Sequence, residues 1–105
     1  MTYETVLSAL ADPTRRDILE SLRGQKCTVA QIADHQPVSR PAVSQHLKIL
    51  SDAGLVQVEP SGTRRYYSIK TDGLRELRHY LDSFWSQTLS AFANEIEKQV
   101  GENHD

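Results

Sequence analysis

The sequence predicts a mainly α-helical protein that carries one small β-hairpin. Along most of the 105 residues, apolar side chains recur every three or four positions, which is the spacing of helices. Between residues 55 and 70 the spacing changes to every second residue, as in β-strands. A chain of this length is typical of one domain, so we expect residues 1–105 to form a single unit.

Two short helices are expected first, at residues 3–10 and 13–23. Asp12 suits the N-cap of the second helix and Pro13 its first position, where the missing N–H of proline costs nothing. Gly24 suits the left-handed conformation that commonly ends a helix. The two helices should therefore meet at a corner.

A third and a fourth helix follow, at residues 29–35 and 40–53. Thr28 and Gln31 have the spacing of a capping box, in which each side chain accepts a hydrogen bond from the other residue's backbone. Ser39 is a suitable N-cap for the fourth helix. Two helices joined by so short a segment form a helix-turn-helix.

A β-hairpin is expected at residues 55–70, with its turn at 60–63, and a long helix at residues 72–100. Val56 and Val58 alternate with polar residues in the first strand. The long helix has large apolar residues at steps of mostly three and four: Leu74, Leu77, Leu81, Phe84, Leu89, Phe92 and Ile96. Such a stripe is suited to packing against a partner helix.

Charge is distributed unevenly, although the overall charge is only −2. Residues 40–70 hold five basic and two acidic side chains, whereas residues 82–105 hold five acidic and one basic. A polyanion would be attracted to the middle of the chain and repelled by its end. Ordinary solvated surface is the alternative explanation of the same charges.

The polar face of the fourth helix is the candidate DNA-reading surface. Val43, Leu47 and Leu50 define its buried stripe, and the polar side chains project from the other side. Arginine can bind guanine and glutamine can bind adenine through paired hydrogen bonds. Any amphipathic helix has a polar outside, so the argument depends on the whole set: Ser39, Arg40, Ser44, Gln45 and Lys48.

The hairpin supplies a second candidate contact. Arg64, Arg65 and Tyr66 follow a glycine-containing tip that can approach a phosphate backbone or a minor groove. The alternative is that these arginines are ordinary solvated residues of a turn and do not contact DNA. With the hairpin as a wing, residues 1–105 are expected to form one winged helix-turn-helix domain.

Three segments together resemble the ArsR family: ADPTRRDIL at residues 11–19, SRPAVSQHLKIL at 39–50 and AGLV at 53–56. The likeness is close over residues 3–69. It implies a transcriptional repressor with a recognition helix and a wing. It also implies a homodimer, formed by the first and last helices, that binds double-stranded operator DNA at an inverted repeat.

The resemblance assigns roles to single residues. Ser44, Gln45 and His46 match base-facing positions of the family, Arg40 matches the start of the recognition helix, and Arg64 and Tyr66 match the wing. Arg15 matches an arginine with a structural role, paired with a carboxylate. The helical wheel leaves a second role open for His46: packing at the edge of the buried stripe, where it orients the helix against the wing.

The dimer interface is expected to combine the first and last helices. The residues assigned to it are Tyr3, Leu7, Leu10, Leu81, Phe84, Trp85, Leu89 and Phe92. Trp85 is expected to pack on the first helix, and an apolar effector pocket there is an alternative. The chain is most similar to the branch of the family without metal ligands, in which regulation comes from autorepression or from a partner protein.

No metal site or cofactor is expected. Cys27 stands alone, and His79, Asp72, Asp82 and His104 do not reproduce the family's ligand spacing. Cys27 is expected to be a small buried residue, with an intersubunit disulfide as the alternative.

An enzyme is not expected, because no phosphate-binding loop or catalytic constellation is present. The stronger rival is a protein-docking module. The residues around Glu4 lack the pattern of a signal peptide, and no apolar run is long enough to span a membrane. A cytoplasmic protein with no membrane partner is therefore expected.

Overall fold

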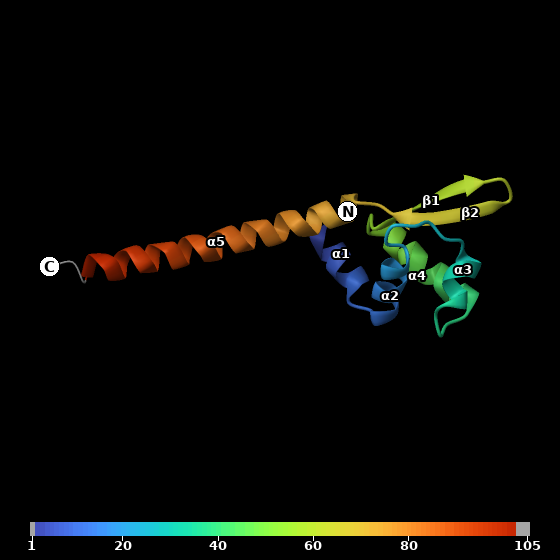
Figure 1. The fold of residues 1–105 in the computed structure, drawn as a ribbon, viewed down its shortest axis with the longest axis horizontal. Helices are drawn as coiled ribbons and strands as arrows, with labels where there is room; N and C mark the ends of the chain where they lie inside the picture. The colour runs from blue at the N-terminus through green and yellow to red at the C-terminus, as the bar shows by residue number, and fades with distance from the viewer. Residues whose placement is uncertain (1, 103–105) are drawn as a thin grey trace.

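The computed structural model describes residues 2–102 and has the predicted order of elements (Figure 1). Figure 1 labels them α1 (Tyr3–Leu10), α2 (Pro13–Ser21), α3 (Val29–Asp34), α4 (Arg40–Asp52), β1 (Val56–Ser61), β2 (Arg64–Ile69) and α5 (Asp72–Glu102). The mainly α-helical fold with one antiparallel hairpin is confirmed, and helix ends lie within two residues of their predicted positions. His104 and Asp105 lie outside the described residues.

The predicted caps of α2 and α3 are confirmed. Asp12 Oδ1 accepts hydrogen bonds from the backbone N–H groups of Thr14 and Arg15, at 2.8 and 3.1 Å. The Thr28 N–H donates to Gln31 Oε1 at 2.9 Å, and the Gln31 N–H donates to Thr28 Oγ1 at 3.2 Å. Each cap satisfies backbone donors that a helix start leaves without a partner.

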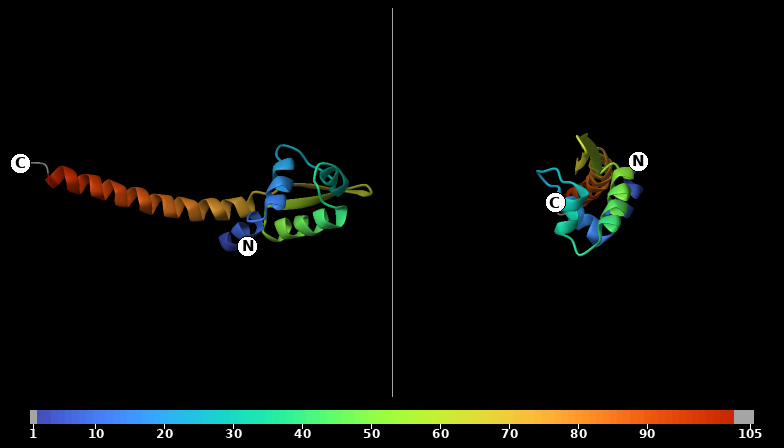
Figure 2. Two further views of the ribbon diagram at one scale, coloured as in Figure 1. Left: turned by 90° about the horizontal axis from the view of Figure 1, so that it is seen from below. Right: turned by 90° about the vertical axis from the view of Figure 1, so that its right-hand side faces the viewer.

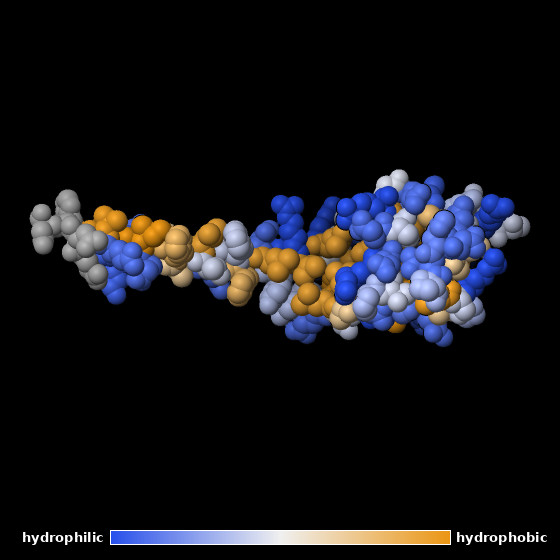
Figure 3. Space-filling view, turned by 60° about the horizontal axis from the view of Figure 1, so that its bottom comes forward, coloured by the Kyte–Doolittle hydropathy of each residue, from blue (hydrophilic) through white to orange (hydrophobic). Residues whose placement is uncertain are grey.

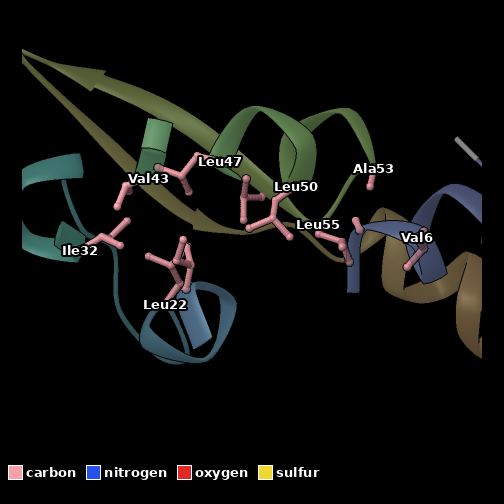
Figure 4. Close-up of a cluster of buried hydrophobic side chains, with 11 residues drawn as sticks. Val6, Leu22, Ile32, Val43, Leu47, Leu50, Ala53 and Leu55 are labelled. Atoms are coloured by element: carbon pink, nitrogen blue, oxygen red, sulfur yellow. The ribbon is translucent and has the colours of Figure 1, made fainter. Parts of the chain in front are cut away.

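The core lies between α1, α2, α3 and α4 and the start of β1 (Figure 4). Val43, Leu47 and Leu50 of α4 lie across from residues of the other helices, such as Leu22 and Ile32. Burying one such side chain contributes about 1.5–3 kcal/mol. The full set, each at most 1% exposed, is Val6, Ala9, Ile18, Leu22, Ile32, Val43, Leu47, Leu50, Ala53, Leu55 and Val56.

The hairpin has a shorter turn than the sequence predicts. The strands pair from Val56 opposite Ile69 to Ser61 opposite Arg64, so only two residues connect them. Gly62, the first of the two, has a φ of 63°, which suits a tight hairpin turn. The predicted four-residue turn at 60–63 is therefore wrong, because its first half continues β1.

Burial along β1 also differs from the alternation in the sequence. Val56 is buried, but Val58 is 41% exposed. The reason is visible in Figures 1 and 2, where the hairpin projects beyond the helices and leaves its outer half without a layer to pack on.

A third extended segment is attached to the wing. Cys27 and Tyr67 form a β-bridge, in which the Cys27 N–H donates to the Tyr67 carbonyl at 3.0 Å and the Tyr67 N–H donates back at 2.7 Å. Next to it, Lys26 Nζ lies 3.2 Å from Glu59 Oε2. Cys27 is half-buried rather than fully buried, because it lies at this edge of the molecule. The bridge fixes the base of the wing to the loop before α3.

Two consecutive arginines hold the end of α1. Arg15 and Arg16 together donate to four carbonyl oxygens in the last turn of α1 and at its C-cap, where a helix leaves carbonyls short of partners. The acceptors are Ser8, Ala9, Leu10 and Ala11, at 3.2, 2.6, 2.9 and 3.2 Å. Arg15 Nη1 also lies 3.8 Å from Asp12 Oδ2, so the predicted structural role of Arg15 beside a carboxylate is confirmed.

The first turns of α5 pack closely on the rest of the chain. The Gly73 N–H donates to the Gly54 carbonyl at 2.9 Å, and a Cβ at residue 73 would overlap the carbonyl oxygen of Ala53. About two turns further, the ring of Tyr80 is stacked on that of Tyr3, with centroids 4.1 Å apart. A side chain larger than hydrogen at residue 73 would therefore force either the start of α5 or the Ala53–Gly54 backbone to shift.

The rest of α5 projects from the body as a rod (Figure 2). The described chain measures 76 × 25 × 22 Å, and its radius of gyration is 20.1 Å, whereas about 13 Å is usual for a compact domain of this length. Apolar side chains gather where α1 meets α5 and continue along the rod (Figure 3). Within one chain, the expectation that Trp85 packs on α1 is wrong, since Tyr80 takes that position and Trp85 is 62% exposed.

Candidate nucleic-acid interface

The start of α4 presents polar side chains because its other side is fixed in the core. The Ser39 hydroxyl oxygen accepts the Ala42 N–H at 3.3 Å and so begins the helix, as the sequence predicts. Val43, Leu47 and Leu50 are fully buried, which sets the rotation of the helix about its axis. The exposed polar residues of its first half and centre are Arg40, Ser44, Gln45 and Lys48.

The polar groups on this face are not engaged by the protein itself. Within residues 2–102, no side-chain hydrogen bond or ion pair involves Arg40, Ser44, Gln45 or Lys48. By contrast, Arg23 pairs with Glu20 at 3.0 Å on the surface of α2. The α4 face therefore holds hydrogen-bonding groups that are available to a ligand.

The wing carries a second set of available donors. Arg64 and Arg65 are exposed, Tyr66 is half-buried, and the described residues give neither arginine a partner. A cleft of about 490 Å³ separates the wing from the start of α3. Its walls are Thr28, Val29, Ala30 and Gln31 on one side and Thr63, Arg64 and Arg65 on the other. Sequence reasoning found the arginines but missed the α3 wall, for which the capping box was the only signal.

The two sets of donors lie at the same end of the molecule. In Figure 1, α3, α4 and the hairpin occupy the end opposite the projecting part of α5. The basic middle of the sequence thus lies at the opposite end of the described chain from the projecting part of α5. His46 does not share the fully exposed face: it is half-buried, and its Nδ1 is buried without a hydrogen-bond partner in the described chain.

The electrostatics of the α1–α2 corner favour an ionised Asp12. The pKa of Asp12 lies below its ordinary value of 3.8, chiefly because the backbone N–H of Arg15 donates to the carboxylate. The Thr14 N–H and the charges of Arg15 and His46 lower it further, while partial burial acts in the opposite direction.

This shift predicts a pH dependence of stability. Because the folded pKa of Asp12 is lowered, its contribution to the free energy of unfolding is complete above about pH 3.8 and declines as the pH falls through the folded pKa. Asp12→Asn keeps a good N-cap without the charge. We expect the stability difference between wild type and Asp12→Asn in urea unfolding to be constant between about pH 6 and pH 5 and to shrink as the pH falls below about pH 4. Parallel pH curves for the two proteins would contradict the assignment.

The residues assigned to a dimer interface are mostly exposed in the single chain. Leu7, Leu81, Phe84, Trp85, Leu89 and Phe92 are 44–63% exposed. Tyr3 and Leu10 are half-buried. An apolar cleft of about 310 Å³ lies between α2, the end of β2 and the start of α5, bordered by Leu10, Leu19, Ile69 and Leu74. This is not the pocket beside Trp85 that the sequence suggested as an alternative, since Trp85 does not border it.

No three His, Cys, Asp or Glu side chains in residues 2–102 are grouped so that they could hold a metal ion. None of the helices in the described part of the chain has the length and hydropathy needed to cross a bilayer.

The sequence is similar to known regulators over most of its length. The profile of the family described as bacterial regulatory protein, arsR family, matches residues 12–58, from the α2 cap into β1. The HTH-type transcriptional regulator Rv2034 of Mycobacterium tuberculosis is 50% identical over 91 residues, which cover 87% of this chain and 85% of that protein. The transcriptional repressor SdpR of Bacillus subtilis is 38% identical over 79 residues, covering 75% and 88%.

The fold is shared with solved structures as well. An ArsR-like transcriptional regulator from Rhodococcus sp. RHA1 superposes with a TM-score of 0.74 at 29% identity, covering 88% of this chain and 90% of that one. The family and these relatives are regulators of transcription and not enzymes, in agreement with the expectation from the sequence. This chain belongs to the ArsR family of DNA-binding transcriptional regulators.

Proposed function

We propose that this chain is a cytoplasmic, homodimeric repressor that binds an inverted-repeat operator. Residues 1–105 act as one winged helix-turn-helix domain, with α4 in the major groove and the hairpin on the backbone or in the minor groove. The observation that carries the proposal is the set of exposed, unpartnered polar groups on the first half of α4, next to a wing with two unpartnered arginines. SdpR, a relative, is named as a transcriptional repressor.

The chemistry of the α4 face suits base edges. Arg40 can donate two hydrogen bonds to guanine, and Gln45 can both donate to and accept from adenine. Ser44 is an adaptable donor and acceptor between them. Since recognition helices contact bases with their N-terminal residues, this placement favours sequence-specific binding. Lys48, further along, suits a phosphate contact.

The wing suits the phosphate backbone. The guanidinium groups of Arg64 and Arg65 border the cleft of about 490 Å³ that faces the start of α3. Two positive charges in that position attract the phosphate backbone, and so they add affinity for DNA that does not depend on the DNA sequence. Tyr66 follows them in sequence and offers a hydroxyl group that can contact the same phosphate backbone.

The homodimer is supported by the shape of α5. This helix has 31 residues, so it is about 46 Å long, yet only its first turns pack on the body. The remaining turns expose a stripe of large apolar side chains, and an exposed apolar stripe of this kind marks an interaction surface. Leu7 of α1 adds to it. A second copy with the same stripe gives the two-fold symmetry that an inverted repeat requires.

We propose that a partner protein or an apolar small molecule relieves repression, and that the repressor uses no cofactor. The apolar cleft of about 310 Å³ beside Leu19 and Leu74 has the size of a small-molecule site. It lies between α2 and the start of α5, so a ligand there would act on the attachment of the long helix. The alternative is control by the amount of repressor alone.

The proposal is tested by titrating the purified protein against fluorescent DNA from its own promoter and against a scrambled duplex. Both titrations are made at two salt concentrations. A preference for the promoter, with affinity that falls steeply as salt rises, is expected because phosphate contacts release counterions. Binding that is absent or insensitive to salt would favour the rival function, a protein-docking module.

Two substitutions separate base recognition from backbone binding. Gln45→Ala is expected to reduce discrimination between operator and random DNA by about 1–3 kcal/mol and to spare nonspecific binding. Arg64→Ala is expected to weaken binding to both and to lower the salt slope by about 1. Gln87→Ala, an exposed glutamine on α5, is the control and should change neither. Equal losses on both DNAs for Gln45→Ala would remove this residue from base recognition.

A further inference from the structure

Two consecutive residues of the loop before α3 hold the two strands of the wing. Through its backbone, Cys27 exchanges two hydrogen bonds with Tyr67 of β2, at 3.0 and 2.7 Å. Through its side chain, Lys26 donates from Nζ to Glu59 Oε2 of β1 at 3.2 Å. The same short loop therefore holds β2 by main-chain hydrogen bonds and β1 by an ion pair.

The ion pair lies closer to the tip of the wing than the main-chain bridge does. The pairing register places Glu59 one residue pair nearer the tip than Tyr67, and the next two residue pairs contain Arg65 and Arg64. None of the side-chain hydrogen bonds or ion pairs in the described chain involves residues 60–66. The ion pair is therefore the last side-chain contact with the body before the two arginines.

Packing holds this part of the hairpin only weakly. Every residue of β1 after Val56 is exposed, including Val58, and the hairpin projects beyond the helices (Figures 1 and 2). A cleft of about 550 Å³ lies between the loop and the outer wing, bordered by Lys26, Glu59, Pro60, Ser61 and Tyr66. The orientation of the outer wing therefore depends on few contacts, and the ion pair is one of them.

We propose that Lys26 and Glu59 are positioning residues, which hold the wing in the orientation in which Arg64 and Arg65 meet the DNA backbone. This inference rests on the proposed function. Ordering a segment during binding costs free energy, so a segment that is already held in place binds more tightly. The ion pair lowers this cost for the wing, although neither of its two residues contacts DNA.

A direct contact with a phosphate is the competing role for Lys26, whose side chain is exposed. In that role, the contribution of Lys26 to DNA affinity would not depend on Glu59. In the positioning role, the contribution of each residue depends on the presence of the other. A double-mutant cycle distinguishes the two roles, because only interacting residues have non-additive effects.

The cycle uses Lys26→Met, Glu59→Gln and the double substitution in the full chain, with the affinity for the promoter duplex as the readout. We expect the loss caused by Lys26→Met to be about two- to fivefold larger in wild type than in the Glu59→Gln protein, which is the scale of an exposed ion pair. This difference should shrink at high salt, which screens exposed charges. Equal losses in both backgrounds would assign Lys26 to a phosphate contact and overturn the positioning role.

A second readout follows the wing without DNA. In Lys26→Met, the NMR order parameters of the backbone amides at residues 61–65 should fall, because β1 is no longer restrained. The charge-exchange variant Lys26→Glu/Glu59→Lys restores a pair of opposite charges at the same net charge, so it should recover part of the lost order. Order parameters that stay at their wild-type values in Lys26→Met would also overturn the positioning role.

Arg23 and Glu20 form the matched control pair. Their ion pair of 3.0 Å is exposed to a similar degree, but it joins residues only three apart in the chain and holds no second element in place. The cycle of Arg23→Met and Glu20→Gln should be additive in promoter binding. A coupling of the same size in this pair would show that the readout reports surface charge in general, which would overturn the inference.

The two proposals fail in different ways. A wild-type chain that does not prefer its promoter would overturn the proposed function and this inference with it. A wild-type chain that does prefer its promoter, combined with an additive cycle for residues 26 and 59, would overturn the positioning role alone.

Discussion

Phe92→Asp is expected to separate the proposed dimer into monomers and to abolish tight operator binding. Phe92 is 63% exposed in the single chain and lies in the middle of the projecting apolar stripe. Burial of a phenylalanine contributes about 1.5–3 kcal/mol, and two-fold symmetry applies the loss twice. The dimer should therefore weaken by roughly 100- to 10,000-fold, which sedimentation equilibrium measures directly.

Ser90→Asp is the matched control for this substitution. It adds the same charge two residues earlier, on the opposite side of the helix from the stripe. The control protein should sediment as wild type does. A Phe92→Asp protein that remains as dimeric as wild type would show that the outer half of α5 is not the interface.

Leu47→Ala is expected to reduce the free energy of unfolding by about 2–5 kcal/mol. Leu47 is 0% exposed, and its removal leaves a cavity between α4 and the helices across the core. Ile49→Ala removes a side chain of similar size from the same helix, but Ile49 is 42% exposed, so the loss should stay below about 1 kcal/mol. Urea unfolding of both variants compares the two losses.

The comparison also checks the rotation of α4. Because Leu47 and Ile49 are two residues apart, they face in different directions around the helix. Similar losses of stability for both would mean that α4 is rotated about its axis away from the orientation in which Leu47 is buried and Ile49 is exposed. The face assigned to DNA would then be wrong as well.

The local parts of this fold could be predicted because their causes are local. The caps at Asp12, Thr28 and Ser39 each depend on a side chain and a backbone group within three residues. The pairing of Cys27 with Tyr67 had no such signal, since the partners are distant in sequence and Cys27 lies in a short loop. Gly73 could not be interpreted for the same reason: the carbonyl that requires a glycine belongs to Ala53.

In the candidate site, too, some features follow from local sequence and others depend on residues that are distant in sequence. The exposed face of α4 follows from three buried residues, Val43, Leu47 and Leu50, so the positions of Arg40 and Gln45 were predictable. His46 lies at the edge of the stripe, where helical spacing alone allows either a buried or an exposed role. Only the packed structure shows that its Nδ1 is buried.

The bridge between Cys27 and Tyr67 has a consequence for folding order. Residues 28–66, which contain the whole helix-turn-helix, form the loop that this bridge closes. Closing a long loop has an entropic cost that is offset only when the enclosed segment is already compact. The bridge should therefore form after α3 and α4 have packed together. Slow hydrogen exchange at the Cys27 and Tyr67 amides would then report that the DNA-binding unit between them is intact.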